Sequence, residues 1–177
     1  TPEEAISEIV REVQQNGDQA LIDFTNRFDN VQITEIGVTA SEIAKAYDVV
    51  DSSLLDALNI AADRIRAFHD RQKIHGWFDA AAGLGQAIRP IGRVGLYVPG
   101  GLASYPSTVL MSGIPANIAG VKEIVVATPA QEGGAIDPAT LVACDIANVH
   151  QIYRIGGPTP LGRSNRKTWQ ILAAFSC

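Results

Sequence analysis

Apolar residues recur three or four positions apart along the first third of the chain, a spacing that predicts a series of helices. Thr1 and Glu4 fit a capping box for the first helix, which is expected to end at Gly17. Asp18 is placed to cap the second helix, and Ser41 to begin a short third one. Residues 51–72 form the longest predicted helix, and residues 32–38 alternate well enough to predict a strand between the second and third helices. These segments are interpreted as scaffold.

Beyond residue 77 the pattern becomes one of short apolar runs. Residues 77–90 predict one or two short strands, and strands are then expected at 94–98, 123–127 and 151–155. Helices are predicted between them at 106–119 and from Asp137 to about Ala147, with Pro115 kinking or breaking the first near Gly113. Strands that alternate with helices through short connections favour a parallel sheet with right-handed crossovers. The expected fold class is therefore α/β: an N-terminal helical scaffold followed by an incomplete Rossmann-like parallel βαβαβ unit.

Charge and composition exclude several classes of partner. The formal charge of −5 argues against bulk electrostatic binding of nucleic acid. No apolar run approaches the ~20 residues needed to span a bilayer, so no membrane partner is expected. The chain opens on Thr1 without an initiator Met or a secretory signal, so the natural chain is expected to begin further upstream. Two isolated cysteines, Cys144 and Cys177, do not form a disulfide framework, and a cytoplasmic location is predicted.

The stretch around Tyr97 carries the strongest hint of a binding site. In open parallel sheets ligands bind in the loops at the carboxyl ends of strands, which here are residues 99–101, 128–129 and 156–157. Gly100 and Gly101 have no Cβ, so a ligand or another backbone can approach closely, and Tyr97 offers a ring and a hydroxyl. The spacing matches neither GxGxxG nor GxxxxGK[ST]. From these residues alone, a binding loop and a tight turn are equally supported.

The other polar residues favour structural interpretations. Ser104, Ser107 and Thr108 could bind an anion at a helix start, but a helix cap is the better interpretation. His69 and His75 are too widely spaced for a metal pair on one helix face. No pair of carboxylates stands out as an acid/base couple. The sequence therefore assigns no catalytic residue and no metal ligand.

Several ordered segments together resemble the histidinol dehydrogenase family. The main block runs from Arg93 to Met111 and continues through residues 114–121. Upstream, Asn16-Gly17-Asp18-Gln19-Ala20-Leu21, Arg27-Phe28-Asp29 and Phe68-His69-Asp70-Arg71-Gln72 are similar to other stretches of the family. The resemblance covers about residues 1–157 and suggests the N-terminal portion of such an enzyme.

The resemblance implies an NAD- and zinc-dependent alcohol dehydrogenase that oxidises L-histidinol to L-histidine, the last step of histidine biosynthesis, and that assembles as a homodimer. The family's NAD-contacting tyrosine falls on Tyr97, so NAD binding is expected at Tyr97, Pro99, Gly100 and Gly101. A further NAD contact, a glutamine, would fall on position 159, where this chain has Thr159. The family's zinc ligands and glutamate–histidine pair lie far downstream, so this chain by itself is expected to be inactive.

The resemblance also suggests how the chain is organised. Residues 1–92 form a helical and α+β scaffold that is part of a larger domain, residues 93–157 form the Rossmann-like NAD-binding half, and residues 158–177 form an aberrant tail. Reading a family-like Ala-His-Ala-Ile-Gly-Ala-Leu coding segment out of frame can give Pro-Thr-Pro-Leu-Gly-Arg-Ser, the sequence at 158–164, which suggests a frameshift. Two alternatives stay open: a paralogous alcohol dehydrogenase of the same family, and a non-catalytic nucleotide-binding module.

Overall fold

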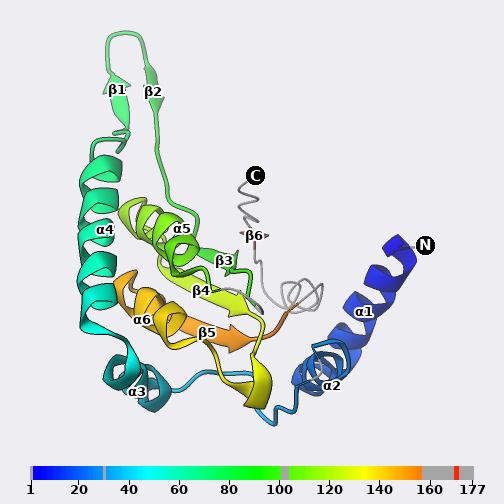
Figure 1. Ribbon diagram of the computed structural model, residues 1–177. Helices are drawn as coiled ribbons and strands as arrows, with labels where there is room; N and C mark the ends of the chain where they lie inside the picture. Colours follow the sequence, from blue (N-terminus) through cyan, green and yellow to red (C-terminus); the bar gives the residue numbers. More distant parts are fainter. Residues whose placement is uncertain (1, 30, 101–103, 157–169, 172–177) are drawn as a thin grey trace.

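The computed structural model describes residues 2–29, 31–100, 104–156 and 170–171 (Figure 1). Its centre is a parallel sheet of β3 (Arg93–Tyr97), β4 (Glu123–Thr128), β5 (Gln151–Arg154) and the very short β6 (Gln170–Ile171), in the order β5-β4-β3-β6. Val94 pairs with Ile124 and Val126 pairs with Ile152, so the first three strands are in a continuous parallel register. The predicted α/β class and the βαβαβ order are confirmed.

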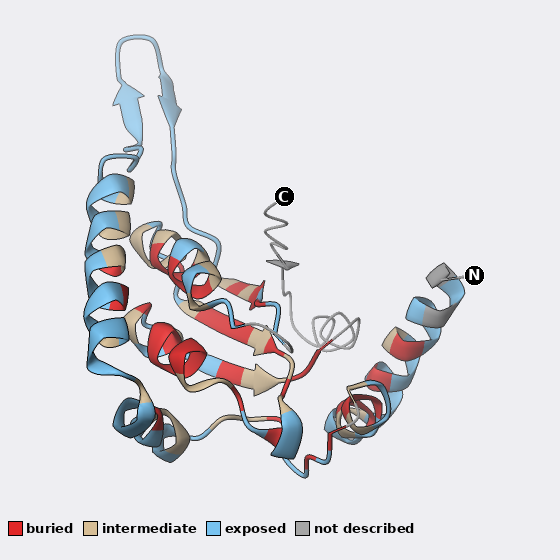
Figure 2. Ribbon diagram, viewed as in Figure 1, coloured by how far each residue is buried: buried red, intermediate tan, exposed pale blue. Residues whose placement is uncertain are grey.

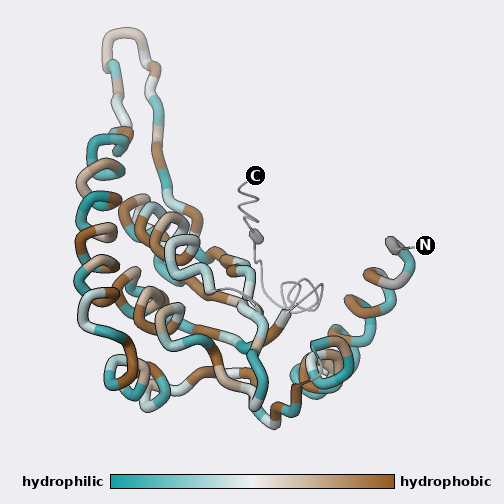
Figure 3. Tube along the Cα trace, viewed as in Figure 1, coloured by the Kyte–Doolittle hydropathy of each residue, from teal (hydrophilic) through white to brown (hydrophobic). Residues whose placement is uncertain are grey.

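The crossover helices α5 (Pro106–Ile118) and α6 (Pro138–Ile146) cover one face of this sheet. Both helices are rich in hydrophobic residues (Figure 3), and they bury Val109, Leu110, Ile114 and Val142 almost completely. Asp137 caps α6 as predicted, because its carboxylate accepts the backbone N–H of Thr140. Together the strands and these helices form the main hydrophobic core (Figure 2).

Of the predicted kink or break near Gly113, the break is wrong, because α5 runs as one helix through Pro115. The proline removes one backbone donor, but α5 is packed between α4 and α6, and these contacts offset that loss. Gly113 marks this close packing: a Cβ there would lie 3.0 Å from the Ala147 Cβ. The helix begins after Tyr105 with no side-chain cap, so the predicted capping by Ser104, Ser107 or Thr108 is also wrong.

Four helices precede the sheet: α1 (Pro2–Asn16), α2 (Asp18–Phe28), α3 (Ala40–Val49) and α4 (Ser52–Asp70). Gly17, at φ 66°, separates α1 from α2, and Asp18 is the first residue of α2 rather than its cap. Thr39, not Ser41, caps α3 in a capping box with Glu42. Asp51 caps α4, which is the longest helix, as predicted. The predicted cap at Thr1 lies outside the described residues.

The helices pack in two groups. Helices α3 and α4 lie over α5 and α6 and extend the main core through Ala46, Leu58 and Ala62. Helices α1 and α2 form a second core with the segment at 31–36 and with Ala130 and Ile155 beside the ends of β4 and β5. The proposed division at residue 92 stays a prediction, and the main core draws on residues from both sides of it.

The strand predicted at 32–38 does not form. This segment has a single bridge, from Gly37 to Tyr153, although the Val38 N–H donates to the Ile152 carbonyl and the Arg154 N–H to the Ile36 carbonyl. Ile33 and Ile36 are both buried although they lie three residues apart, so the apolar residues of this segment make core contacts without forming a strand ladder.

A hairpin projects from the end of α4, and its tip extends beyond the helical layer (Figure 1). It consists of β1 (Trp77–Asp79) and β2 (Leu84–Gln86), which confirms the strands predicted within 77–90. Every residue from 71 to 92 is exposed, including Trp77, Phe78 and Leu84. An apolar surface of this kind is typical of a region that packs against further protein.

The contrast between neighbouring residues of α5 gives a test of this core. Leu110 is 1% exposed and Met111 is 63% exposed. We expect Leu110→Ala to lower the free energy of unfolding by about 2–5 kcal/mol, because it removes buried methyl groups and leaves a cavity. Met111→Ala should change it by less than about 0.5 kcal/mol. Urea unfolding followed by far-UV circular dichroism measures both; equal losses would contradict the assigned orientation of α5.

Candidate functional site

The turns that follow β3, β4 and β5 meet at Pro129. A Cβ added to Gly100, after β3, would lie 3.0 Å from the Pro129 Cγ and 3.3 Å from the Thr128 Oγ1. A Cβ added to Gly156, after β5, would lie 2.8 Å from the Pro129 Cβ. Pro129 is therefore held between two glycines, and a larger residue at Gly156 would force the turns apart.

Tyr97 stands at the edge formed by these turns. It is the last residue of β3, pairs with Ala127 of β4 and is 37% exposed. The next residue, Val98, is fully buried and donates its N–H to the Ala127 carbonyl, so the backbone on both sides of Tyr97 is fixed. Pro99 and Gly100 follow and are exposed. The structure thus brings together three of the four predicted binding residues, while Gly101 lies outside the described residues.

Asp29 also reaches this edge, and sequence reasoning gave it no role. It follows α2, and its Oδ2 would lie 2.8 Å from a Cβ on Gly156. Burial raises the pKa of the Asp29 carboxyl. The only signal in the sequence is that Asp29 belongs to one of the family-like stretches. Its contact with Gly156 depends on the way in which α2 packs beside the sheet.

The hydroxyl of Ser104 has a structural partner. Its Oγ donates to Asp137 Oδ1 at 2.6 Å, and the same oxygen accepts the Thr140 N–H at 2.9 Å. Ser104 therefore connects the segment after β3 to the start of α6. This contact accounts for Ser104 without an anion.

Arg154 fixes the end of β5 to the segments around it. Its guanidinium donates to the carbonyls of Gly134 at 3.1 Å and Gly37 at 3.0 Å, and to the Glu42 carboxylate at 2.6 Å. Burial alone would raise the pKa of Glu42, but hydrogen bonds from Thr39 and Arg154 outweigh it and lower the pKa. This ion pair ties α3 to the carboxyl edge of the sheet.

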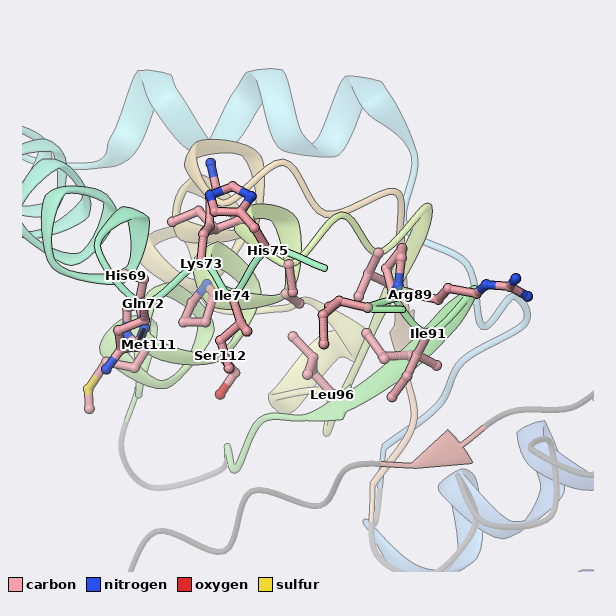
Figure 4. A pocket seen from close by; sticks show the side chains of 18 of the residues that line it. His69, Gln72, Lys73, Ile74, His75, Arg89, Ile91, Leu96, Met111 and Ser112 are labelled. Atoms are coloured by element: carbon pink, nitrogen blue, oxygen red, sulfur yellow. Dashed lines mark hydrogen bonds between the residues drawn. The ribbon is translucent and has the colours of Figure 1, made fainter. Parts of the chain in front are cut away.

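A groove lies at the base of the hairpin, away from the edge at Pro129 (Figure 4). This groove of 880 Å³ is lined by the end of α4, the hairpin stem, β3 and α5, with Ile91, Leu96 and Met111 among its apolar residues. His69 and His75 also line it, and the His69 Nδ1 lies 2.6 Å from the Gln72 Oε1. Its lining includes none of Tyr97, Pro99 and Gly100, so the groove is separate from the edge at Pro129.

Within the described ranges, no three His, Cys, Asp or Glu side chains lie close enough together to hold a metal ion. In that same part of the chain, no helix combines the length and the apolar character that crossing a membrane requires.

These features define an α/β protein whose parallel strands present glycine-containing turns at one edge, the arrangement in which such sheets bind ligands. A family model for histidinol dehydrogenase matches residues 1–162. The chain therefore belongs to the histidinol dehydrogenase family, a family of oxidoreductases.

Individual relatives agree with this assignment. The histidinol dehydrogenase of Bacillus cereus (strain ATCC 10987 / NRS 248) is 50% identical over 160 residues, which cover 89% of this chain and 37% of that protein. That of Methanococcus maripaludis is 48% identical over 161 residues, covering 89% and 38%. The crystal structure of histidinol dehydrogenase from Elizabethkingia anophelis matches with a TM-score of 0.86 and 36% identity, covering 92% of this chain and 38% of that one. The chain thus spans about 37% of the length of the first of these relatives.

The ion pair at Arg154 predicts how stability depends on pH. Because the pKa of Glu42 is lowered in the folded chain from its ordinary 4.5, ionised Glu42 adds stability above that value. That stability is lost as pH falls through the lowered pKa. Glu42→Gln should therefore be less stable than the parent chain at neutral pH, and the difference should shrink on acidification below the ordinary value.

Thermal melts of both chains across this pH range measure the difference. Glu35→Gln, which removes an exposed carboxylate from the segment before α3, is the control for the loss of one charge. A gap between parent and Glu42→Gln that stays constant down to acidic pH would contradict the assignment.

Proposed function

We propose that this chain is the N-terminal, NAD-binding portion of a histidinol dehydrogenase whose whole-enzyme substrate is L-histidinol. The observation that carries the proposal is the edge at Pro129, where Tyr97 is exposed three residues before Gly100, whose Cβ position is closed off by Pro129 and Thr128. Family membership supports the same conclusion, because the relatives that match this chain are named histidinol dehydrogenases.

The residues at this edge fit a nicotinamide dinucleotide. Tyr97 supplies an aromatic ring on which a planar base or nicotinamide can stack. Gly100 leaves the backbone bare on its exposed side, so that a phosphate or ribose can approach the N–H groups. Pro99 stiffens the turn between them. Bound NAD would supply the acceptor for the hydride removed from an alcohol, while these residues hold and orient it.

The described residues do not fit the zinc ion that the family implies. A zinc site needs three or four ligands in one place, and within the described residues no group of three candidate ligands exists. We propose that zinc, the acid/base residues and the substrate contacts belong to the remainder of the enzyme, and that this chain alone does not turn over L-histidinol.

We further propose that the whole enzyme is a cytoplasmic homodimer. The exposed apolar hairpin and the groove at its base support assembly with further protein, since Trp77, Phe78 and Leu84 are each more than half exposed. Both the remainder of the enzyme and a second copy are compatible with this surface.

Cofactor binding by Tyr97 can be measured directly. Stacking of a base on an aromatic side chain contributes about 1–3 kcal/mol, so Tyr97→Ala should raise the Kd for NAD about tenfold. Tyr47→Ala is the matched control, because Tyr47 is 36% exposed and lies on α3. Isothermal titration calorimetry of the three chains measures this; equal affinities would contradict the placement of the cofactor at Tyr97.

The identity of the whole enzyme can be tested from its coding DNA. Sequencing about a kilobase beyond the codon for Gly157 should reveal, in a shifted frame, a family-like continuation with the glutamate–histidine pair and the zinc ligands. Zinc ligands are expected in that continuation because the described residues of this chain hold no zinc site. Finding no such frame would favour a nucleotide-binding module that acts without the catalytic half.

A further inference from the structure

Asp29 is held rigidly where α2 ends. Its backbone N–H donates to the Thr25 carbonyl at 2.9 Å and so closes the last turn of the helix. Asn26, one turn of helix earlier, binds the chain that follows: its Oδ1 accepts the Ile33 N–H at 2.8 Å. The packing of Ile33 and Phe24 in the second core fixes the same region. These contacts fix the backbone that carries the Asp29 side chain.

Both oxygens of this carboxylate face the turn after β5. A Cβ on Gly156 would lie 2.8 Å from Oδ2 and 3.2 Å from Oδ1, and also 2.8 Å from the Pro129 Cβ. Only glycine fits between the carboxylate and the proline. The contacts then continue from Pro129 to Gly100, whose Cβ position is 3.0 Å from the Pro129 Cγ.

Packing alone does not explain a carboxylate at this position. The Asp29 Oδ2 is buried and has no hydrogen-bond partner among the described residues. A buried acceptor without a donor is destabilising, and an apolar side chain of the same size would avoid that cost. Burial also raises the pKa of this carboxyl, as expected for an acid removed from water. An unpaired buried acid at this position indicates a role beyond filling space.

We propose that Asp29 is a positioning residue for the cofactor edge: its carboxylate holds the backbone of the turn at Gly156 against Pro129. The attraction is between the carboxylate charge and the backbone dipoles of the turn, since the Asp29 Oδ2 itself has no hydrogen-bond partner among the described residues. Through Pro129 the same contact sets the place of Gly100 and the turn that follows Tyr97. Asp29 thus couples the N-terminal helices to the edge. The effect on NAD rests on the proposed function, whereas the anchoring of Gly156 does not.

The experiment follows two readouts in the intact chain: hydrogen exchange at the Gly156 amide, observed by NMR, and the Kd for NAD. Asp29→Ala should speed exchange at Gly156 and weaken NAD binding, each about tenfold. Asp29→Asn keeps the size of the side chain and one acceptor oxygen but removes the charge, so it should recover only part of both losses, whereas a purely space-filling role predicts full recovery. Asp23→Ala, on the exposed side of α2, is the control and should change neither.

A second pair of variants tests the contact itself. Gly156→Ala should weaken NAD binding, because the new methyl group collides with Asp29 and Pro129. In the Asp29→Ala background the additional loss should be smaller, since one of the two collisions is gone, so the two effects should not add. Thermal melts of all variants separate these local effects from a general loss of folding, and Asp29→Asn carries the test if Asp29→Ala does not fold.

The outcomes are distinguishable. If the parent chain binds no NAD but Asp29→Ala still speeds exchange at Gly156, the proposed function fails and the anchoring stands. If the parent chain binds NAD and neither Asp29 variant changes exchange or affinity, the role of Asp29 is overturned. Additive effects of the Asp29 and Gly156 substitutions would also overturn it.

Discussion

The apolar face of the parallel sheet has to be removed from water, and α5 and α6 accomplish this. Both helices cross over between adjacent parallel strands, so the right-handed rule places them on the same face. Their buried residues meet Val94, Leu96 and Ile124 in one continuous core. Because the strands are parallel, this arrangement also sends all their carboxyl ends to one edge. The position of the candidate site is thus a consequence of how the core is buried.

Close approach of the backbone gives that edge its shape. Two glycines allow the turns after β3 and β5 to reach Pro129, and Arg154 secures the end of β5 through two carbonyls and Glu42. The second core, formed with α1 and α2, brings an acidic side chain to the same place. Ligand-binding edges benefit from such cross-links, because a site held rigidly binds its ligand without first having to be ordered.

Away from this edge, one face of the sheet and several apolar side chains are left less covered. Parallel sheets are usually covered on both faces, but here the layer formed by α3, α4, α5 and α6 lies on one side. The hairpin and the groove beside it expose apolar residues, among them Phe78 and Met111. The chain spans about 37% of the length of its Bacillus cereus relative, so these surfaces are where the proposed remainder of the enzyme would pack.

The sequence by itself determined the order of elements and the family. Local signals were sufficient for this: Asp51 and Asp137 cap their helices, short apolar runs form β3, β4 and β5, and five ordered segments carry the resemblance. It also placed Tyr97 and Gly100 at a strand end, because strand ends can be read from a local pattern.

Only the tertiary structure decided the features that depend on distant neighbours. The alternation at 32–38 predicted a strand, yet Ile33 and Ile36 are buried in the second core with α2 and Ile155, and the segment has one bridge. Pro115 predicted a break, yet packing against α4 and α6 keeps α5 whole. Apart from its place in a family-like stretch, Asp29 gave no signal of a role, because that role depends on Gly156, a residue far along the chain. Local propensity selects the elements, whereas contacts between remote residues decide which side chains share an edge.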